Sequence, residues 1–375
     1  MANWILPLAI LCVMLTATMS PCMGQKETIT VTDLRGKDVT LDVPAENIVL
    51  QWSGAGGALL TLFALEGKDA PKKIAAMDTT LKINRMDIWE KFTEAFPEMK
   101  DIPEVGDTVD LSTEKVISLK PDAVVVPLNG YNQAPDIYKI LEDASIPVVV
   151  IDYHSETLEN HTKSILLLGK LLGKEERAQK LADYYAQEMD KVNLRLKEIS
   201  KKSPTVYVEC GSQGPSEYGN SYGRRYMWGG LIDACRGTNI AEGAVAAGKA
   251  AAINPEFLLT QNPDIIIITG AYWPAAADSM RLGYNTTLEG SLESLKTFTK
   301  RPGWDTLDAV KNNRVYGISH VLSRDIWDFV GNQYFAKLFY SEEFNDLDPE
   351  ENLKTFYKEF MPVDYSGVWM ISLEE

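Results

Sequence analysis

Four arginines are the residues in this sequence best suited to hold an anion. Arg224 and Arg225 follow a glycine-rich segment, and Arg281 and Arg324 each come after a predicted strand end. Because the formal net charge is −16, arginines gathered at one rim would attract anions locally. Guanidinium groups bind carboxylate, catecholate or phosphate oxygens directionally. The alternative for each arginine is an ordinary surface salt bridge, and we expect at least two of the four to share an anion-binding role.

Aromatic residues and histidines also collect where predicted strands end. In open α/β sheets, ligands bind outside the carboxyl ends of the strands. Aromatic rings either offer a ligand a large contact area there or cap the core of the protein. Tyrosine and histidine could ligate iron, but their spacing assigns no metal site. The expected ligand-binding residues besides the arginines are Trp52, Tyr131, His154, Tyr218, Tyr226, Trp228, Tyr272, Trp273 and Trp327.

The same inventory argues against catalysis and against nucleic-acid binding. The chain has three histidines, and none belongs to a serine nucleophile-elbow motif. It contains neither a P-loop nor a G-x-G-x-x-G motif after a predicted strand. The acidic surface would repel a phosphate backbone. We therefore expect a protein that is not an enzyme, needs no cofactor and has no nucleic-acid partner.

A phrase that occurs twice indicates the elements that position these residues. Residues 114–122, EKVISLKPD, precede the apolar run 123–126, and residues 256–264, EFLLTQNPD, precede the apolar run 265–268. Each copy predicts a short helix that ends at Pro-Asp and a buried strand. Continuous apolar strands are typical of parallel sheets covered on both faces. The repeat predicts two α/β lobes with mostly parallel sheets and a ligand cleft between them.

The length and the pattern of the chain suggest a division into five parts. A chain of 375 residues with 45% hydrophobic and 24% charged residues is large enough for two cores. Residues 156–202 predict a helical spine, in which one helix ends near Gly173 and the next begins at Lys174. We assign residues 25–155 to the N-terminal lobe, 203–345 to the C-terminal lobe and 346–375 to a C-terminal extension.

The N-terminal residues predict export from the cytoplasm, and export decides how the cysteines are interpreted. The apolar stretch of residues 4–19 predicts that residues 1–24 form a signal peptide or lipoprotein signal, with Cys22 as a lipid anchor. No lysine or arginine precedes Lys26, so an uncleaved anchor is the alternative. Outside the cytoplasm, Cys210 and Cys235 could form a disulfide or remain two buried thiols.

Several phrases together resemble one protein family. They are 31–39, VTDLRGKDV; 44–49, PAENIV; both copies of the repeat; 167–175, LLGKLLGKE; 237–241, GTNIA; and 310–316, VKNNRVY. The chain resembles the periplasmic substrate-binding proteins of the iron-siderophore and cobalamin class of ABC importers. The resemblance covers residues 28–343 and implies two lobes joined by one long helix, with the ligand held between them. It also implies that Glu114 and Glu256 dock onto the permease; the alternative is that these acids complement helix dipoles.

Together these observations predict a monomeric, extracytoplasmic solute-binding component of an ABC importer, whose partners are a permease and its ATPase subunits. The expected ligand is an anionic metal chelate, with a ferric siderophore-type complex as the leading candidate. The alternatives are a corrinoid, haem or a molybdate-like oxyanion, or a sensing module that is not coupled to transport. The sequence leaves the identity of the ligand open.

Overall fold

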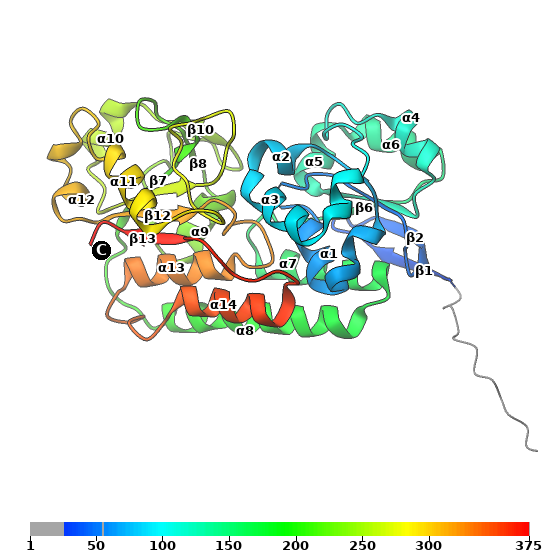
Figure 1. Ribbon diagram of the computed structural model, residues 1–375. Coiled ribbons are helices and arrows are strands. Elements are labelled where there is room, and N and C mark those ends of the chain that lie inside the picture. Colours follow the sequence, from blue (N-terminus) through cyan, green and yellow to red (C-terminus); the bar gives the residue numbers. More distant parts are fainter. Residues whose placement is uncertain (1–25, 55, 375) are drawn as a thin grey trace, which may run out of the picture.

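The computed structural model describes residues 26–54 and 56–374. Two α/β lobes lie side by side above a layer of helices (Figure 1). This arrangement confirms the predicted fold class. The predicted signal segment and Cys22 lie outside the described residues. Within the described part of the chain, no helix combines the length and the apolar character needed to cross a membrane.

The N-terminal lobe contains a four-stranded parallel sheet with the order β4-β3-β5-β6. Its strands are almost entirely buried and apolar, as expected for a sheet covered on both faces. An antiparallel hairpin precedes the sheet and pairs Val31 with Val39, as the alternating sequence pattern predicts. The strands are β1 (Glu27–Thr32), β2 (Asp38–Val43), β3 (Ile48–Leu50), β4 (Ile74–Met77), β5 (Ala123–Pro127) and β6 (Val148–Ile151). The helices are α1 (Leu59–Glu66), α2 (Thr80–Asn84), α3 (Met86–Ala95), α4 (Thr113–Leu119), α5 (Leu128–Gln133) and α6 (Pro135–Asp143), with 3-10 turns at Gly67–Lys73 and Pro97–Asp101.

The C-terminal lobe contains a five-stranded sheet with the order β13-β12-β11-β7-β9. Four strands are parallel, and β13 joins the edge in the antiparallel direction. The strands are β7 (Thr205–Cys210), β9 (Thr238–Asn239), β11 (Ile265–Gly270), β12 (Val315–Ser319) and β13 (Met370–Ser372), with a separate ribbon of β8 (Asn220–Tyr222) and β10 (Ala250–Ala252). The helices are α9 (Met227–Ala234), α10 (Pro255–Gln261), α11 (Leu288–Phe298), α12 (Asp308–Lys311) and α13 (Phe329–Phe339), with 3-10 turns at Gly211–Gln213 and Trp304–Thr306.

The repeated phrase builds the same corner of each lobe. It forms α4 and β5 in the first lobe and α10 and β11 in the second. The aspartate that ends each copy holds the start of the neighbouring strand: Asp122 accepts hydrogen bonds from the backbone N–H groups of Glu46 and Asn47, and Asp264 accepts one from that of Thr205. The shared chemistry explains why the phrase recurs.

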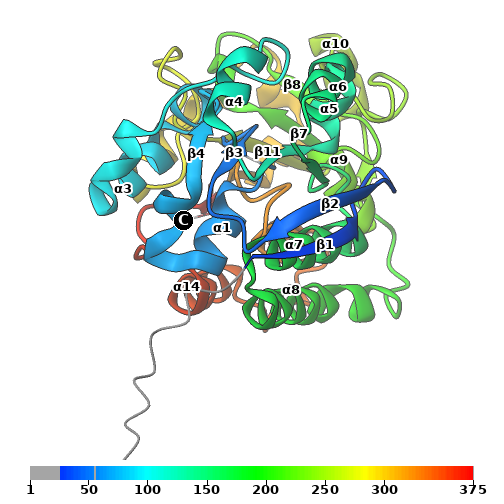
Figure 2. The same ribbon diagram turned by 90° about the vertical axis from the view of Figure 1, so that its right-hand side faces the viewer.

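Two helices follow the first lobe, α7 (Leu158–Leu172) and α8 (Glu175–Leu196). Gly173 ends α7 in the left-handed conformation, with φ of 64°, and this confirms the predicted helix break. The 22-residue α8 runs beneath both lobes, whereas α7 lies between α8 and the hairpin (Figures 1 and 2). Only α8 therefore acts as the spine that spans the molecule.

The C-terminal extension is built into both the helical layer and the second sheet. Helix α14 (Pro349–Phe360) lies beside α8, where the Tyr184 ring packs on Phe360 at 5.3 Å and on Phe356 at 6.0 Å. Arg177 of α8 donates to the carbonyl of Ala64 in α1 and to that of Phe360. The chain then returns to form β13 at the edge of the C-terminal sheet. The extension thus braces the spine against both lobes.

The two described cysteines are free thiols, so the disulfide alternative for Cys210 and Cys235 is wrong. Their neighbours differ: the thiol of Cys210 contacts the hydroxyl of Ser212, whereas that of Cys235 is buried against the carbonyl of Asn332. Burial raises the pKa of Cys235. Cys235 therefore behaves as a small core residue rather than a reactive one.

Candidate functional site

Parallel strands of both lobes direct their carboxyl ends toward the junction between the lobes, where a cavity of about 370 Å³ lies. Such strand ends are the usual ligand-binding positions of α/β sheets. Nine of the lining residues come from the N-terminal lobe and four from the C-terminal lobe. The lining residues are Trp52, Gly54, Thr80, Asn84, Arg85, Asp107, Thr108, Val109, Gln133, Cys210, Trp273, His320 and Arg324.

Two arginines, one from each lobe, supply positive charge to this cavity. Arg85 connects α2 to α3 and is 2% exposed, and Arg324 follows β12 and is 8% exposed. Neither forms an ion pair with a carboxylate among the described residues, and the Nε atom of each is buried without a hydrogen-bond partner. Burial, followed by the charge of Arg324, lowers the pKa of Arg85 to about 10. Two nearly buried guanidinium groups that make no close ion pair are candidates to hold an anion, and the acidic charges that act on them include those of Asp87 and Glu156.

Two tryptophans provide aromatic walls. Trp273 follows β11, lies under the Arg85 guanidinium at 5.8 Å and meets His320 edge-on at 5.7 Å. Trp52 follows β3, adopts a φ of 62° and meets His154 edge-on at 5.3 Å. The walls and the cations together suit a ligand with negative charge and flat, apolar parts.

A buried aspartate holds the loop that presents Trp52. The carboxylate of Asp78 accepts hydrogen bonds from the backbone N–H groups of Trp52, Ser53 and Thr80, and from the hydroxyls of Ser53 and Thr80. Burial raises the pKa of Asp78 despite these bonds. The fixed loop explains how a tryptophan keeps a left-handed backbone conformation at the wall of the cavity.

Two histidines lie near the cavity, one in its wall and one behind the wall. His320 lines the cavity, and its Nδ1 accepts from the Trp228 indole N–H at 3.4 Å and lies 2.7 Å from the Thr269 hydroxyl. The neutral ring therefore carries its proton on Nε2. His154 lies behind Trp52 and stacks on Tyr226 of the other lobe at 6.5 Å. Burial, followed by nearby arginine charges, lowers the pKa of both histidines well below the usual value. Both rings are therefore neutral at pH 7.

Of the residues expected to bind the ligand, the structure brings Trp52, Trp273 and Arg324 into the cavity wall. His154 and Tyr226 form the layer behind Trp52. These five residues come from separate strand ends or loops of the two lobes, and the fold brings them together at the junction.

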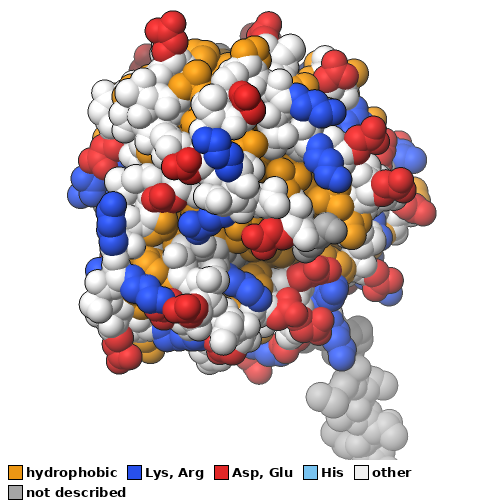
Figure 3. All heavy atoms as spheres, turned by 90° about the vertical axis from the view of Figure 1, so that its left-hand side faces the viewer, with side chains coloured by type: hydrophobic (Ala, Val, Ile, Leu, Met, Phe, Trp, Pro, Cys, Tyr) orange, Lys and Arg blue, Asp and Glu red, His pale blue; other side chains and the backbone are white. Residues whose placement is uncertain are grey.

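The other expected arginines lie elsewhere. Arg224 is exposed and pairs with Asp233 and Glu242, which is the salt-bridge alternative. Arg225 is exposed outside the cavity, and Arg281 lies over the Tyr272 ring at 4.4 Å, beside a separate hollow near α11. On the outer face of the C-terminal lobe, basic and acidic side chains are interspersed, and this view shows no large basic patch (Figure 3). The arginines that line the interlobe cavity are thus Arg324 and Arg85 rather than Arg224, Arg225 and Arg281.

The remaining expected aromatic residues pack within the lobes. Tyr131 stacks on Tyr138 and under Arg35, and Tyr218 packs on Arg301 and Trp304. Trp228 and Trp327 are fully buried, with Phe335 and Tyr357 as their stacking partners. For these residues, the alternative of a core-capping role holds.

Sequence reasoning missed Arg85. The apolar run Ile74–Met77 predicts a strand, and that strand is present, but the residues beyond its end drew no attention as ligand contacts. Arg85 lies beyond that strand and a five-residue helix, so a search of every strand end would have included it. The asparagine, threonine and aspartate residues of the cavity carry no comparable signal in the sequence.

Glu114 and Glu256 occupy equivalent positions. Each is exposed in the first turn of its helix, after an N-capping side chain, Ser112 or Asn254. Helices α4 and α10 lie at the two upper corners of the molecule, on the side opposite α8 (Figure 1). The two acids therefore mark one face that both lobes share.

Two α/β lobes, a helical spine and an interlobe cavity define the class of two-lobed solute-binding proteins. The family model described as periplasmic binding protein matches residues 58–322. The chain belongs to this family, as the sequence resemblance predicted.

Known proteins agree with this assignment. The crystal structure of the TroA-like periplasmic binding protein FepB from Veillonella parvula is similar, with a TM-score of 0.87 and 46% identity over 92% of this chain and 99% of that chain. An uncharacterized ABC transporter substrate-binding lipoprotein, YvrC of Bacillus subtilis, is 27% identical over 222 residues, which is 59% of this chain and 62% of YvrC. The match thus spans less than two thirds of YvrC. The high-affinity heme uptake system protein IsdE of Staphylococcus aureus is 28% identical over 222 residues, 59% of this chain and 68% of IsdE.

Proposed function

We propose that this protein is the extracytoplasmic solute-binding component of an ABC importer, and that it captures an anionic metal chelate of the ferric siderophore type in the interlobe cavity. It binds and releases the ligand without converting it. Its partners are a permease and the ATPase subunits of the importer. Membership in the periplasmic binding protein family supports this role, and the name of the YvrC relative points the same way.

The observation that carries the choice of ligand is the pair Arg85 and Arg324. In a protein of formal net charge −16, two guanidinium groups line one cavity and make no close ion pair with a carboxylate among the described residues. Leaving like charges buried together costs free energy unless a ligand neutralises them. A chelate with carboxylate or catecholate oxygens would neutralise both arginines, and its rings would lie against Trp52 and Trp273.

Haem is the second candidate, and His320 is the observation that favours it. His320 lines the cavity, and neutral imidazole is a common iron ligand; ligation through Nε2 would require the ring proton to move from Nε2 to Nδ1. The two propionates of haem would pair with Arg85 and Arg324. The heme-uptake relative supports this candidate. Substitution of His320 by Ala separates the two: it would remove an axial ligand of haem but leave the charge pairing of a siderophore unchanged.

Calorimetric titration with three probes, a ferric tris-catecholate, haemin and molybdate, tests the proposal. Arg85→Ala and Arg324→Ala should each weaken binding of the preferred anionic probe by at least about ten-fold, or about 1.4 kcal/mol, with little dependence on salt. Arg224→Ala is the matched control, because Arg224 is an exposed arginine in surface ion pairs. Parent-like affinity of both cavity variants for every probe would refute the proposed anion site.

A further inference from the structure

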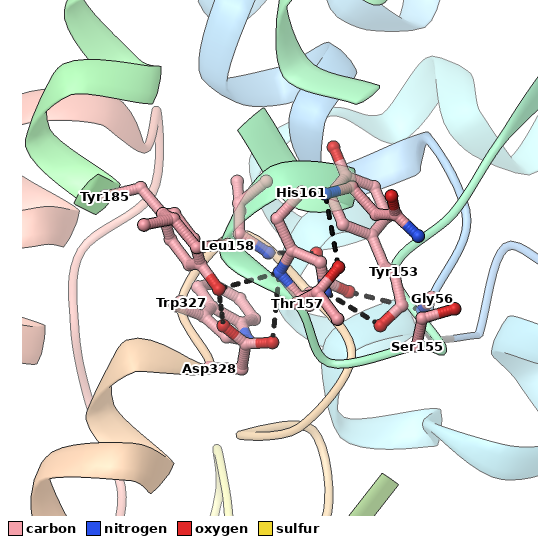
Figure 4. Close-up of polar contacts among 12 residues, drawn as sticks. Gly56, Tyr153, Ser155, Thr157, Leu158, His161, Tyr185, Trp327 and Asp328 are labelled. Atoms are coloured by element: carbon pink, nitrogen blue, oxygen red, sulfur yellow. Dashed lines mark hydrogen bonds and ion pairs between the residues drawn. The ribbon is translucent and has the colours of Figure 1, made fainter. Parts of the chain in front are cut away.

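A cluster of three potential metal ligands lies outside the cavity, between the helical layer and the C-terminal lobe. Glu156 precedes α7, His161 belongs to α7, and Asp328 comes directly before α13. Figure 4 shows His161 and Asp328 facing each other beside Tyr185. One ligand atom from each lies within 4.8 Å of the others. His161 is fully buried and Asp328 is 1% exposed. The cluster therefore brings a nitrogen and two carboxylates together away from water.

The hydrogen bonds of His161 fix which ring nitrogen faces the carboxylates. Its Nε2 lies 2.8 Å from the backbone carbonyl of Tyr153, and because a carbonyl only accepts, Nε2 carries the proton. Nδ1 lies 3.1 Å from Asp328 Oδ2 and is the nitrogen that carries a lone pair when the ring is neutral. Metal-ligating histidines typically donate their other N–H to a carbonyl or carboxylate in this way.

In this cluster, the hydrogen-bond acceptor atoms outnumber the hydrogens that neighbouring groups can donate. Tyr185 donates its single hydroxyl hydrogen either to Asp328 Oδ1 at 2.7 Å or to His161 Nδ1 at 2.8 Å. Both carboxylate oxygens of Glu156 and Oδ2 of Asp328 are buried without a hydrogen-bond partner. Two adjacent buried carboxylates need positive charge or added protons; the charge of Arg324 acts on Glu156, and a bound cation would supply the rest.

We propose that Glu156, His161 and Asp328 bind one divalent transition-metal ion, which ties the helical layer to the C-terminal lobe. One imidazole nitrogen and two carboxylate oxygens suit zinc, manganese or ferrous ions rather than calcium, which takes about six to eight oxygens. The two carboxylates balance the charge of the ion. The hydroxyl of Tyr185 is placed to complete the coordination or to hydrogen-bond a ligating carboxylate.

The proposed ion site is separate from the ligand cavity. None of its three residues lines the cavity wall, whose potential metal ligands are Cys210, His320 and Asp107. Glu156 precedes α7 on the N-terminal side, whereas Asp328 precedes α13 of the C-terminal lobe. A bound ion would therefore act as a structural link between two parts of the fold, and transport need not depend on it.

Metal uptake by the metal-free, untagged full-length chain tests the site. Zinc and manganese should bind at about one equivalent per chain and raise the Tm. Glu156→Gln should weaken this binding by at least about ten-fold. Substitution of residues that only hydrogen-bond to a metal ligand already lowers metal affinity by about this factor. Glu188→Gln is the matched control: Glu188 is also buried, on α8, but it bonds Lys191 and Gln333 instead. It should bind the ion as the parent does.

Cobalt substitution in the parent protein decides the location without any variant. Cobalt in the proposed site should show visible d–d absorption but no thiolate-to-cobalt charge-transfer band, because the site has no cysteine. Such a band would place the ion beside Cys210 in the cavity and would overturn the proposal. The proposal would also be overturned if the parent took up no zinc, manganese or cobalt, or if parent and Glu156→Gln took up equal amounts. In that case the carboxylates of the cluster are neutralised by protons instead of a metal ion. Neither result would affect the proposed solute-binding function.

Discussion

At the scale of residues, the proposed anion site depends on two arginines whose charges are costly to leave unpaired. Arg85 and Arg324 are nearly buried, and the charge of Arg324 contributes to the low pKa of Arg85, about 10. This repulsion disappears when an anion binds between the two groups. In the proposed function, relief of this repulsion contributes to the affinity for an anionic ligand.

Asp87 gives a pH-dependent prediction at the contact between the lobes. Its Oδ2 accepts a hydrogen bond from the Tyr284 backbone at 3.1 Å, and burial raises its pKa to about 7 against the charge of Arg85. Since the unfolded pKa is about 3.9, the folded state binds the proton more tightly. The free energy of unfolding should therefore fall as the pH rises from about 4 to 7 and then level off.

Asp87→Asn should remove this component, which is at most about 1.4 kcal/mol per pH unit. Urea unfolding of parent and variant at about pH 5 and about pH 8 measures the difference. The variant should gain stability relative to the parent at the higher pH. An identical difference at the two pH values would show that Asp87 has an ordinary pKa.

The sequence predicted this site in part. Strand ends located Trp52, Trp273 and Arg324, because the position of a strand end follows from an apolar run. The role of Arg224 could not be predicted, since its ion pair with Glu242 joins residues that only the fold brings together. The same holds for Arg281, which lies over the Tyr272 ring. Only the folded structure shows which arginines make no ion pair with a carboxylate.

At the scale of elements, the contact between α7 and α8 depends on one glycine. A Cβ atom at Gly169 would lie 2.2 Å from the Cβ of Ala178 in α8. Gly169→Ala should therefore force the helices apart and lower the free energy of unfolding by about 1–3 kcal/mol. Thermal or urea denaturation measures this loss.

Gly290 in α11 provides the control, because the nearest atom to a Cβ at this position is the Thr287 hydroxyl oxygen at 3.2 Å. Gly290→Ala should be neutral or stabilise the helix by up to about 1 kcal/mol. Equal effects of the two substitutions would show that close helix packing is not the reason for Gly169.

Elements with strong local signals were predicted well, and those that depend on packing were not. The repeat and the break at Gly173 are local signals, and both are confirmed. The role of α14 and β13 depends on rings such as Phe356 and Phe360 meeting Tyr184 of α8. That pairing joins segments far apart in the chain, so no short window of sequence contains it.

At the scale of the whole molecule, the lobes already contact each other around the cavity. Met86 donates to the carbonyl of Tyr272 at 3.3 Å, and Asn285 donates to Glu90 at 3.1 Å. Helix α8 runs beneath both lobes. A continuous helix resists the backbone rotations that flexible hinges absorb, so we expect only modest closure on ligand binding. X-ray scattering with and without ligand measures it, and a large compaction would contradict this expectation.

The shared upper face gives a second prediction at this scale. Glu114 and Glu256 lie exposed on α4 and α10, one on each lobe, and we propose that they dock onto the permease. Reversing both to Lys should abolish uptake by cells while ligand affinity stays at the parent value, because neither residue lines the cavity. Reversal of Glu293 and Glu359, which lie on other helices, is the control. Survival of uptake in the Glu114→Lys, Glu256→Lys variant would disprove the docking role.

The most direct test of the account is native mass spectrometry of the protein purified from its own host, combined with metal analysis and an absorption spectrum. The parent should carry one anionic metal complex per chain, and the double variant Arg85→Ala, Arg324→Ala should carry none while retaining its fold by circular dichroism. A neutral corrinoid in the parent, or the same complex in the double variant, would contradict the claim that these two arginines hold the ligand.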